Sequence, residues 1–480
     1  MKKYVFSGVA CLFLSLMSCA QDAPKSSPPI DPVDQQDDPP VVPTATEEPE
    51  RTLPSQLPTI SDPMFMTGTT PYESKYDAGK WFLRPLEKPY LGTITKSGND
   101  PAMISFGGGL TAGVSNGGLN REGQQFAYPN LVARQMGVAN FKTPLLDEKE
   151  ANGTGIFLYG EPNGDFPRWL EVTNKLAHLE PGEPVKMTPF PGLIHNFAFP
   201  NGGTIGASYP YCPSCKPQAY SSRFSDYKIT KDTTLLKSIQ RKQQYDFVIM
   251  EDFYDAFVNW IVNQPRLDDR FSLANYASVP TYAMDAMVNK GQKGVVFTIP
   301  HFKHLGFMNW YDIEVLKKMA PSIAMVYWIT GNAAVANHTQ EFYLKPTKYT
   351  EGVFGTAEKG KPIQGQITDM DIIDQGEAWF ADPERVVNPS VRKFAEKYGL
   401  ALVDLHAVYQ KIHDGTYLTE DGLKIDGSLK GNFFSCDGTY PTPLGQAVIA
   451  NEVIKAINLK YDARISLINV SEFIRIISSK

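Results

Sequence analysis

Four short apolar runs constrain the fold of this 480-residue chain more than any other feature. An apolar run of five or six residues without alternating polar positions is typical of a strand that is buried on both faces of a parallel sheet. The runs are Ala102–Phe106, Asp246–Met250, Gly294–Ile299 and Leu400–Leu405. We therefore expect a parallel sheet that contains these strands.

Amphipathic segments lie between and around the runs, and this alternation favours an α/β domain with helices on both faces of the sheet. The predicted helical segments are Phe126–Met136, Ser278–Asn289, Pro389–Tyr398 and Pro443–Ile457, and the last is expected to begin with Thr442 as N-cap and Pro443 at its first position. Two Gly/Pro-rich stretches, 139–230 and 330–385, are expected to form loops or small inserted strands at the carboxyl edge of the sheet.

The first residues have the pattern of a targeting segment. Lys2 and Lys3 precede an apolar run that is too short for a permanent membrane span. The run ends in Leu-Met-Ser-Cys at 16–19, which resembles the lipobox of bacterial lipoproteins. The resemblance implies that residues 1–18 are a signal peptide and that Cys19 carries the lipid that anchors the protein to a membrane.

Residues 19–60 are expected to form a disordered tether. Positions 20–60 hold eight acidic and two basic residues, ten prolines and no aromatic residue, so this segment cannot bury a core. Its charge equals the net charge of −6 of the whole chain, and residues 61–480 have no basic excess of the kind that nucleic-acid binding requires. We therefore assign the folded domain to 61–480 and expect no nucleic-acid partner. Asp22 and the acidic tether slightly favour the cell surface over the periplasmic face of an outer membrane.

Two long blocks resemble the SGNH/GDSL hydrolases, in particular their bacterial lipoprotein branch. Ile104–Gly137 reads ISFGGGLTAGVSNGGLNREGQQFAYPNLVARQMG and is similar to the first family block, in which a strand ends in G-[DN]-S-L-T-A-G. Phe434–Asn458 reads FSCDGTYPTPLGQAVIANEVIKAIN and is similar to the last block. The resemblance covers most of residues 100–470 and implies a three-layer α/β/α, flavodoxin-like fold.

The family's catalytic groups are a serine nucleophile, a histidine base, an aspartate that orients the histidine, and oxyanion donors from a glycine and an asparagine. The nucleophile position falls on Gly109, which has no side chain that could attack a carbonyl, and the base position falls on Tyr440. Only the aspartate is present, as Asp437. Because its histidine partner is missing, we interpret Asp437 as a residue that holds an Asp-Gly turn.

The oxyanion donors are also changed. The glycine position in the second block, Asn196–Gly202, falls on Asn201, although an alignment shifted by one residue would place Gly202 there. In the third block, Asp252–Asp255, the donor asparagine falls on Tyr254. We expect Tyr254 and Tyr440 to fill the former active site with their hydroxyls hydrogen-bonded, because a buried phenol needs a partner.

The resemblance therefore implies a pseudoenzyme that works by binding, either as a subunit of an outer-membrane assembly or as a binder of a glycan or peptide. Two alternatives are a purely structural surface protein and an active hydrolase with a relocated nucleophile or a metal. The candidate serines for a relocated site are Ser208, Ser221 and Ser222, none of which lies on a recognisable nucleophile elbow.

Several acidic and histidine side chains follow the predicted strands and should meet at the carboxyl edge of the sheet. They are Glu251, Asp252, Asp255, His301, His304 and Asp437. They could form a replacement metal site, but His-x-x-His without a third fixed ligand is a weak pattern. We favour a solvated acidic loop with ordinarily bonded histidines, and we expect no metal and no cofactor.

Three cysteines remain once Cys11 has left with the signal peptide and Cys19 has been lipidated. In an exported protein they are expected to form a disulfide, in which Cys212 pairs with either Cys215 or Cys436.

Overall fold

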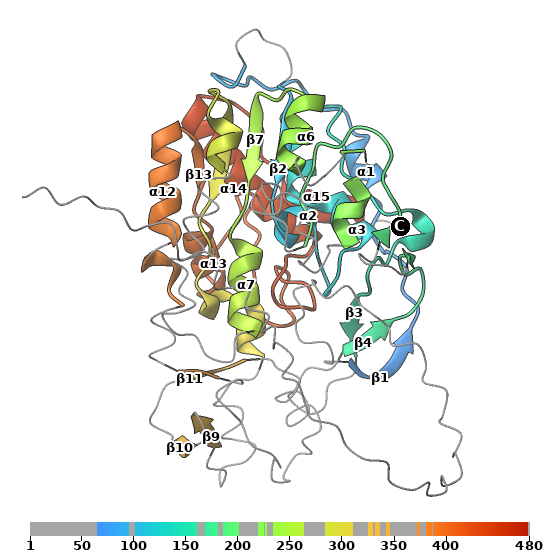
Figure 1. Ribbon diagram of the computed structural model, residues 1–480, viewed down its shortest axis with the longest axis vertical. Helices are drawn as coiled ribbons and strands as arrows, with labels where there is room; N and C mark the ends of the chain where they lie inside the picture. The colour runs from blue at the N-terminus through green and yellow to red at the C-terminus, as the bar shows by residue number, and fades with distance from the viewer. Residues whose placement is uncertain are drawn as a thin grey trace, which may run out of the picture. The chain divides into compact units, whose positions relative to one another are not determined.

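In the computed structural model, the centre of the domain is a four-stranded sheet in which every neighbouring pair is parallel (Figure 1). Its order is β13-β8-β7-β2. The strands are β2 (Met103–Phe106), β7 (Phe247–Met250), β8 (Lys293–Phe297) and β13 (Ala401–Val403). All four predicted strands are confirmed, with ends that differ by one or two residues, and an α/β fold with a parallel sheet is thereby established.

The structure describes residues 65–95, 101–160, 169–180, 186–200, 219–224, 226–227, 234–263, 284–310, 325–329, 332–336, 342–345, 372–374, 381–385 and 387–478. All of them belong to one compact unit, Thr52–Lys480. The signal peptide with Cys19 and the tether lie outside the described residues, so these expectations stay predictions.

A segment from the second block adds to the free edge of β2. The N–H of Ser105 donates to the carbonyl of His195 at 2.8 Å, and the N–H of Phe197 donates to the carbonyl of Ser105 at 2.8 Å. The chain therefore leaves β2 toward one side of the sheet and later returns on the other side as β7. Such a switch point, at the carboxyl end of the strands, is where open α/β sheets form their sites.

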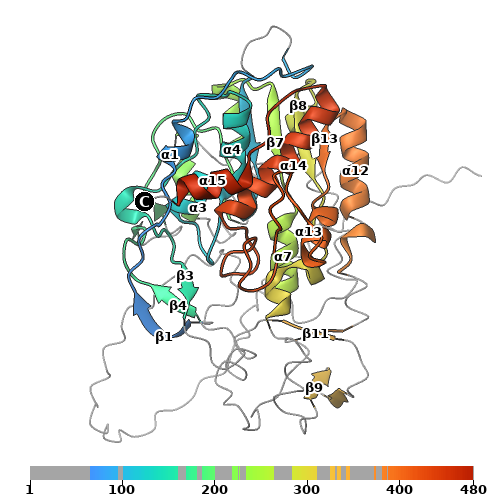
Figure 2. The ribbon, with the colours of Figure 1, turned by 180° about the vertical axis from the view of Figure 1, so that it is seen from behind.

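Helices lie on both faces of the sheet. The helices α4 (Tyr128–Gln135) and α14 (Pro443–Tyr461) pack together on the face that is turned to the viewer in Figure 2. The helices α6 (Leu235–Lys242) and α7 (Tyr254–Asn263) lie on the opposite face, toward the viewer in Figure 1. The other α-helices among the described residues are α1 (Gly79–Phe82), α2 (Gly109–Ala112), α3 (Arg121–Phe126), α12 (Val387–Tyr398), α13 (Leu405–His413) and α15 (Val470–Ile477). Within the described ranges, no helix has the length and apolar character that a membrane crossing requires.

Two of the predicted helices show how local chemistry sets their ends. Helix α14 begins as expected, with the Thr442 hydroxyl accepting the N–H of Gly445 at 3.1 Å and Pro443 in the first turn. The helix predicted over Phe126–Met136 is confirmed as α4, but it begins two residues later than predicted, because α3 ends at Phe126 and α4 starts anew at Tyr128. Pro129 explains the break, since its ring would clash with a carbonyl in the preceding turn of a continuous helix.

The two Gly/Pro-rich stretches contain small inserted strands, as expected. The first contributes β3 (Phe157–Tyr159), β4 (Trp169–Val172), β5 (Leu179–Glu180) and β6 (Lys186–Met187), and β1 (Phe65–Thr70) joins β4 and β3 in a three-stranded sheet. The second contributes β10 (Asn332–Ala336), which pairs with the preceding strand β9 (Met325–Ile329), and the pair β11 (Phe342–Leu344) with β12 (Ile372–Asp374). The indole N–H of Trp169 donates to the carbonyl of Cys436 at 2.9 Å, so β4 packs against the loop of the last block.

Candidate functional site

The turn that follows β2 brings two backbone N–H groups to the carboxyl edge of the sheet, where each meets a buried carboxylate. The N–H of Gly109 donates to Asp255 Oδ2 at 2.6 Å, and the N–H of Gly108 donates to Glu251 Oε2 at 3.1 Å. Both acidic residues follow the neighbouring strand β7, and their exposed fractions are only 1% for Glu251 and 4% for Asp255. Two N–H groups that could bind a ligand anion are therefore occupied by the protein's own carboxyl groups.

The close approach of these groups requires glycine in the turn. A Cβ atom on Gly108 would lie 2.3 Å from Cγ of Asp255. A Cβ atom on Gly109 would lie 2.9 Å from both Cζ and the hydroxyl oxygen of Tyr440. Position 109, which the predicted alignment pairs with the family's nucleophile, thus has no room for a side chain while Tyr440 keeps its place.

Tyr440 is fully buried above this turn. Its hydroxyl donates to Asp255 Oδ1 at 2.8 Å, so both carboxylate oxygens of Asp255 accept hydrogen bonds. Burial first, and then the nearby Asp255 carboxylate, raise the pKa of Tyr440 well above its ordinary value. The phenol therefore keeps its proton at neutral pH, and it acts as a hydrogen-bond donor at the position that the predicted alignment pairs with the family's base.

Tyr254 fills the adjacent space. Its hydroxyl donates to the carbonyl of Thr439 at 2.5 Å and accepts a hydrogen bond from the Tyr409 hydroxyl at 3.3 Å. The rings of Tyr254 and Tyr440 lie 5.8 Å apart, and burial raises the pKa of Tyr254 well above its ordinary value. The expectation that both tyrosines are buried with bonded hydroxyls is confirmed.

Asp437 is fully buried, and it holds two loops together. Its Oδ1 accepts the N–H groups of Thr439 at 2.8 Å and Tyr440 at 2.7 Å, and its Oδ2 accepts the N–H of Gly117 at 2.9 Å. Burial raises the pKa of Asp437, and the backbone hydrogen bonds oppose this rise. The geometry agrees with the interpretation of Asp437 as a turn residue, and it shows that this turn positions Tyr440.

Glu251 is the most perturbed carboxyl group of the site. Besides the N–H of Gly108, it accepts the N–H of Tyr254 at 2.9 Å and the hydroxyl of Thr111 at 3.2 Å. Burial and then the charge of Asp255 raise the pKa of Glu251 to about 8, and Asp252 contributes a smaller increase. The site therefore contains one carboxyl group that titrates near neutral pH.

The two histidines proposed with these acids lie in another cluster. The rings of His301 and His304 are 5.7 Å apart, and His304 also lies 5.9 Å from His406 and 5.2 Å from His413. Burial and the neighbouring histidines lower the pKa of His301 to about 3 and that of His304 to about 4. Across the described part of the chain, no three His, Cys, Asp or Glu side chains are arranged to hold a metal ion. The sequence reasoning missed His406 and His413, although their spacing of seven places them on one face of α13.

The remaining candidates are partly outside the described residues. This applies to Asn201, Gly202, Ser208, Cys212, Cys215 and the side chain of Ser221. The Ser222 hydroxyl accepts the N–H of Met187 at 2.8 Å and donates to its carbonyl at 3.1 Å, which ties it to β6. Cys436 carries a free thiol, and burial raises its pKa to about 12. A Cys212–Cys215 disulfide stays a prediction.

Asp255 is the residue whose role the sequence reasoning missed. It was considered only as a metal ligand, whereas in the structure it accepts hydrogen bonds from Gly109 and Tyr440. The signal was its place at the end of the third block, one residue after Tyr254.

Comparisons with known protein families, with curated proteins and with solved structures give no match. The resemblance to the SGNH/GDSL hydrolases therefore stays a prediction from the sequence blocks.

The contact between Gly109 and Tyr440 predicts a coupled pair of substitutions. Gly109→Ser should lower the free energy of unfolding by about 1–3 kcal/mol, because the new side chain overpacks the space beside Tyr440. Tyr440→His should lower it by about 1–3 kcal/mol, because Asp255 loses its phenol donor. The double variant should be more stable than the sum of the two single effects predicts, because histidine lacks the Cζ and hydroxyl atoms that the serine side chain would contact in Tyr440.

Urea unfolding of the four proteins measures this coupling. Tyr409→Phe is the control partner, because Tyr409 is not among the nearest neighbours of a Cβ at position 109, and its effect should add to that of Gly109→Ser. If the effect of Gly109→Ser on the unfolding free energy added to that of Tyr440→His as it does to that of Tyr409→Phe, the steric contact between positions 109 and 440 would be contradicted.

The raised pKa of Glu251 predicts a pH dependence of stability. Its pKa rises from 4.5 to about 8 on folding, so the folded protein binds this proton more tightly than the unfolded chain. Glu251 therefore lowers the free energy of unfolding of the protein as the pH increases from about 4.5 through about 8. In Glu251→Gln, the fall in unfolding free energy between pH 5 and pH 8 should shrink by about 2 kcal/mol or more. The exposed Glu396→Gln on α12 is the control, and an equal pH slope in all three proteins would show that Glu251 is not responsible.

Proposed function

We propose that this chain is a lipid-anchored protein with an SGNH-like domain that has no hydrolase activity and acts by binding. The observation that carries the proposal is the Asp255 carboxylate, which accepts the N–H of Gly109 and the hydroxyl of Tyr440. In the proposed family alignment, these two residues stand at the positions of the nucleophile and the base.

Acyl transfer requires an attacking atom, a proton acceptor, and donors that stabilise the oxyanion. Gly109 supplies no attacking atom, and the raised pKa of Tyr440 keeps its phenol protonated. The N–H of Gly109 already donates to a carboxylate, whose negative charge would repel an oxyanion at the same place. Each requirement thus fails for a separate physical reason, which supports a pseudoenzyme over a hydrolase with one weakened step.

The fold supports the family proposal in its coarse features. A parallel sheet, helices on both faces and a switch point beside β2 are all compatible with a three-layer α/β/α domain. The first and last blocks also meet in space, because the N–H of Asn116 donates to the Ser435 hydroxyl at 2.8 Å and Gly117 is bonded to Asp437.

The lipobox and the acidic, proline-rich tether support a place at the outer membrane, where we favour the cell surface. There the domain would act as a subunit of an outer-membrane protein assembly or as a binder of a glycan or peptide. Purification in mild detergent separates these roles, since a stoichiometric membrane protein would co-elute only with a subunit.

The absence of hydrolase activity can be tested directly on the full chain. We expect no hydrolysis of short-chain nitrophenyl esters above the rate in buffer, and no labelling by a fluorophosphonate, which modifies activated serines. An active serine esterase in the same assays is the positive control. Turnover that is abolished by Asp437→Asn, Tyr440→Phe or Ser222→Ala would overturn the pseudoenzyme proposal in favour of a relocated site.

The anchor is tested by a single substitution. We expect the wild-type protein to sediment with membranes and Cys19→Ala to be released into the soluble fraction, because this change removes the thiol that would carry lipid. Cys436→Ala, which leaves position 19 intact, is the control and should sediment like the wild type. Retention of Cys19→Ala on membranes would contradict anchoring through this residue.

A further inference from the structure

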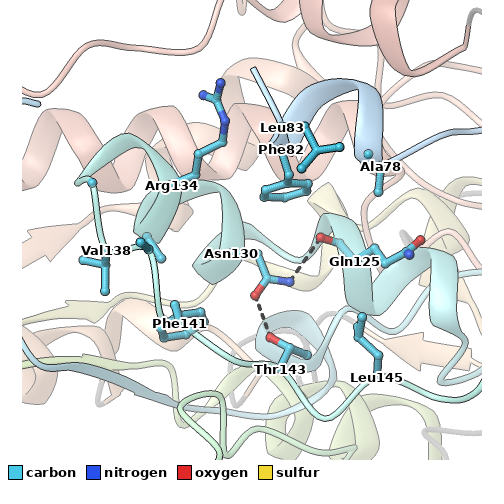
Figure 3. A pocket seen from close by; sticks show the side chains of 14 residues that line it. Ala78, Phe82, Leu83, Gln125, Asn130, Arg134, Val138, Phe141, Thr143 and Leu145 are labelled. Atoms are coloured by element: carbon cyan, nitrogen blue, oxygen red, sulfur yellow. Dashed lines mark hydrogen bonds between the residues drawn. The ribbon is translucent and has the colours of Figure 1, made fainter. Parts of the chain in front are cut away.

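The apolar groove beside α1 and α4 is neutral (Figure 3). Arg134 is the one charged residue among its described lining residues, and the guanidinium points away from the centre and stacks on Trp81 at 4.6 Å. Asn130 inside the groove accepts the Thr143 hydroxyl at 2.6 Å. Titratable side chains outside the Asp255 network gather in a different place, at the carboxyl end of β8.

Four of the seven histidines of the chain lie together there. His301 and His304 belong to segment 301–310, which follows β8, and His406 and His413 lie on α13. The ring centroid of His304 is 5.7 Å from that of His301, and it is 5.9 and 5.2 Å from those of the two α13 histidines. Positive charges this close repel each other where water is partly excluded. These four residues, the histidine cluster, therefore favour the neutral form.

The hydrogen bonds of the cluster also fit neutral rings. Nδ1 of His301 accepts the N–H of Lys303 at 3.2 Å and so caps the short 3₁₀ turn Phe302–His304. A charged imidazole carries a proton on both nitrogens, so a charged His301 would place two donors face to face. Nδ1 of His304 is buried, and no described residue hydrogen-bonds to it. A proton on this atom would be a buried donor without an acceptor, which is costly.

The charges nearest to His301 and His304 also oppose protonation. Burial, the neighbouring histidines and Lys303 lower the pKa of His301 to about 3. The same causes lower the pKa of His304 to about 4, although the Asp414 carboxylate at the end of α13 acts in the opposite direction. Tyr343 of β11 faces the cluster from another side, and the Lys303 ammonium lies 4.9 Å from the centre of its ring.

The other carboxylate beside the cluster serves His406. Glu384, which precedes α12, lies 3.7 Å from Nδ1 of His406. It is also bonded to both terminal nitrogens of Arg392, at 2.6 and 2.9 Å, and Arg392 pairs with Asp404 at 3.3 Å. This network joins α12 to the start of α13, and it offers no partner to the rings of segment 301–310.

Segment 301–310 supports the loop of the last block. The N–H of Phe307 donates to the carbonyl of Gly438 at 2.9 Å. The two backbones are so close that a Cβ on Gly438 would lie 2.5 Å from the nitrogen of Phe307. Gly438 comes two residues before Tyr440, so a change in segment 301–310 can reach the candidate site through this contact.

We propose that the histidine cluster is an acid-sensitive contact, through which protons loosen segment 301–310 from α13 and weaken its support of the last-block loop. Phe302, Leu305 and Phe307 are buried in this segment, so we expect it to stay folded in mild acid and to open more often. The inference uses no family alignment, and it is therefore independent of the proposed function.

The sign of the effect follows from linkage. The two rings have pKa values of about 3 and 4 in the packed segment and the ordinary value of 6.5 when exposed, so an open state binds protons more tightly. The contact is strongest above pH 6.5 and weakens as the pH falls toward 4. The opening constant should increase roughly 20-fold for each of the two rings between pH 7 and pH 5.

Hydrogen–deuterium exchange of the full chain, followed by mass spectrometry, measures this opening. Exchange rates at pH 7 and pH 5 are divided by the intrinsic rates at the same pH, which gives a protection factor for each peptide. We expect the protection of 301–310 to fall by up to about 400-fold between the two pH values. At pH 5 it should also be lower than that of β7 in the centre of the sheet, because the segment opens without unfolding of the domain.

Two variants test the origin of the response, and only the ratio between pH 7 and pH 5 within each variant is compared, so a constant loss of stability cancels. His301→Gln with His304→Gln should reduce the fall in protection to less than about fivefold. The exposed His178→Gln, outside the cluster, is the matched control and should respond like the wild type. Lys303→Glu supplies a carboxylate to both rings and should reduce the fall at least about threefold, whereas the exposed Lys290→Glu should not.

Three results would overturn the proposal. The first is a wild-type fall in protection of 301–310 of less than about fivefold between pH 7 and pH 5. The second is an equal fall in the double histidine variant and in His178→Gln. The third is equal protection of 301–310 and β7 at pH 5, since the cluster would then be exposed only when the whole domain unfolds.

Discussion

One carboxylate, that of Asp255, joins three parts of the chain that are far apart in sequence. It accepts the N–H of Gly109, 146 residues earlier, and the hydroxyl of Tyr440, 185 residues later. The loss of a hydrogen bond to a buried carboxylate is destabilising, because the charge is no longer solvated by that donor. The turn after β2, the start of α7 and the loop before α14 are therefore held in one arrangement by a single group.

Two further buried carboxyl groups, those of Glu251 and Asp437, also hold loops together by accepting backbone N–H groups. Glu251 binds the N–H groups of Gly108 and Tyr254, and Asp437 binds those of Gly117, Thr439 and Tyr440. In each case the acceptors satisfy backbone donors of tight turns that have no partner in a helix or sheet. Glu251 is the group for which burial is most costly to the charged form, because burial and the charge of Asp255 raise its pKa to about 8.

The sequence predicted the strands well and the site only in part. Four apolar runs identify the sheet, because a strand buried on both faces needs apolar residues throughout. The break at Ala127 was missed, since the apolar periodicity of Phe126–Met136 hides the effect of Pro129. The burial of Tyr254 and Tyr440 was foreseen from their size and their positions in the blocks. Their partners were not, because Asp255 and Thr439 reach them only through the tertiary fold.

The internal anion also explains why the changes at this site occur together. An oxyanion hole functions because its donors are free until charge develops on the substrate. In the proposed alignment, the donor at position 109 is bound to a carboxylate that cannot leave, since Asp255 belongs to α7 and is buried. A serine at 109 would meet Tyr440, and a histidine at 440 would remove the phenol that keeps Asp255 paired. A substitution at position 109 or 440 therefore disturbs the other position, because both residues meet at the carboxylate of Asp255.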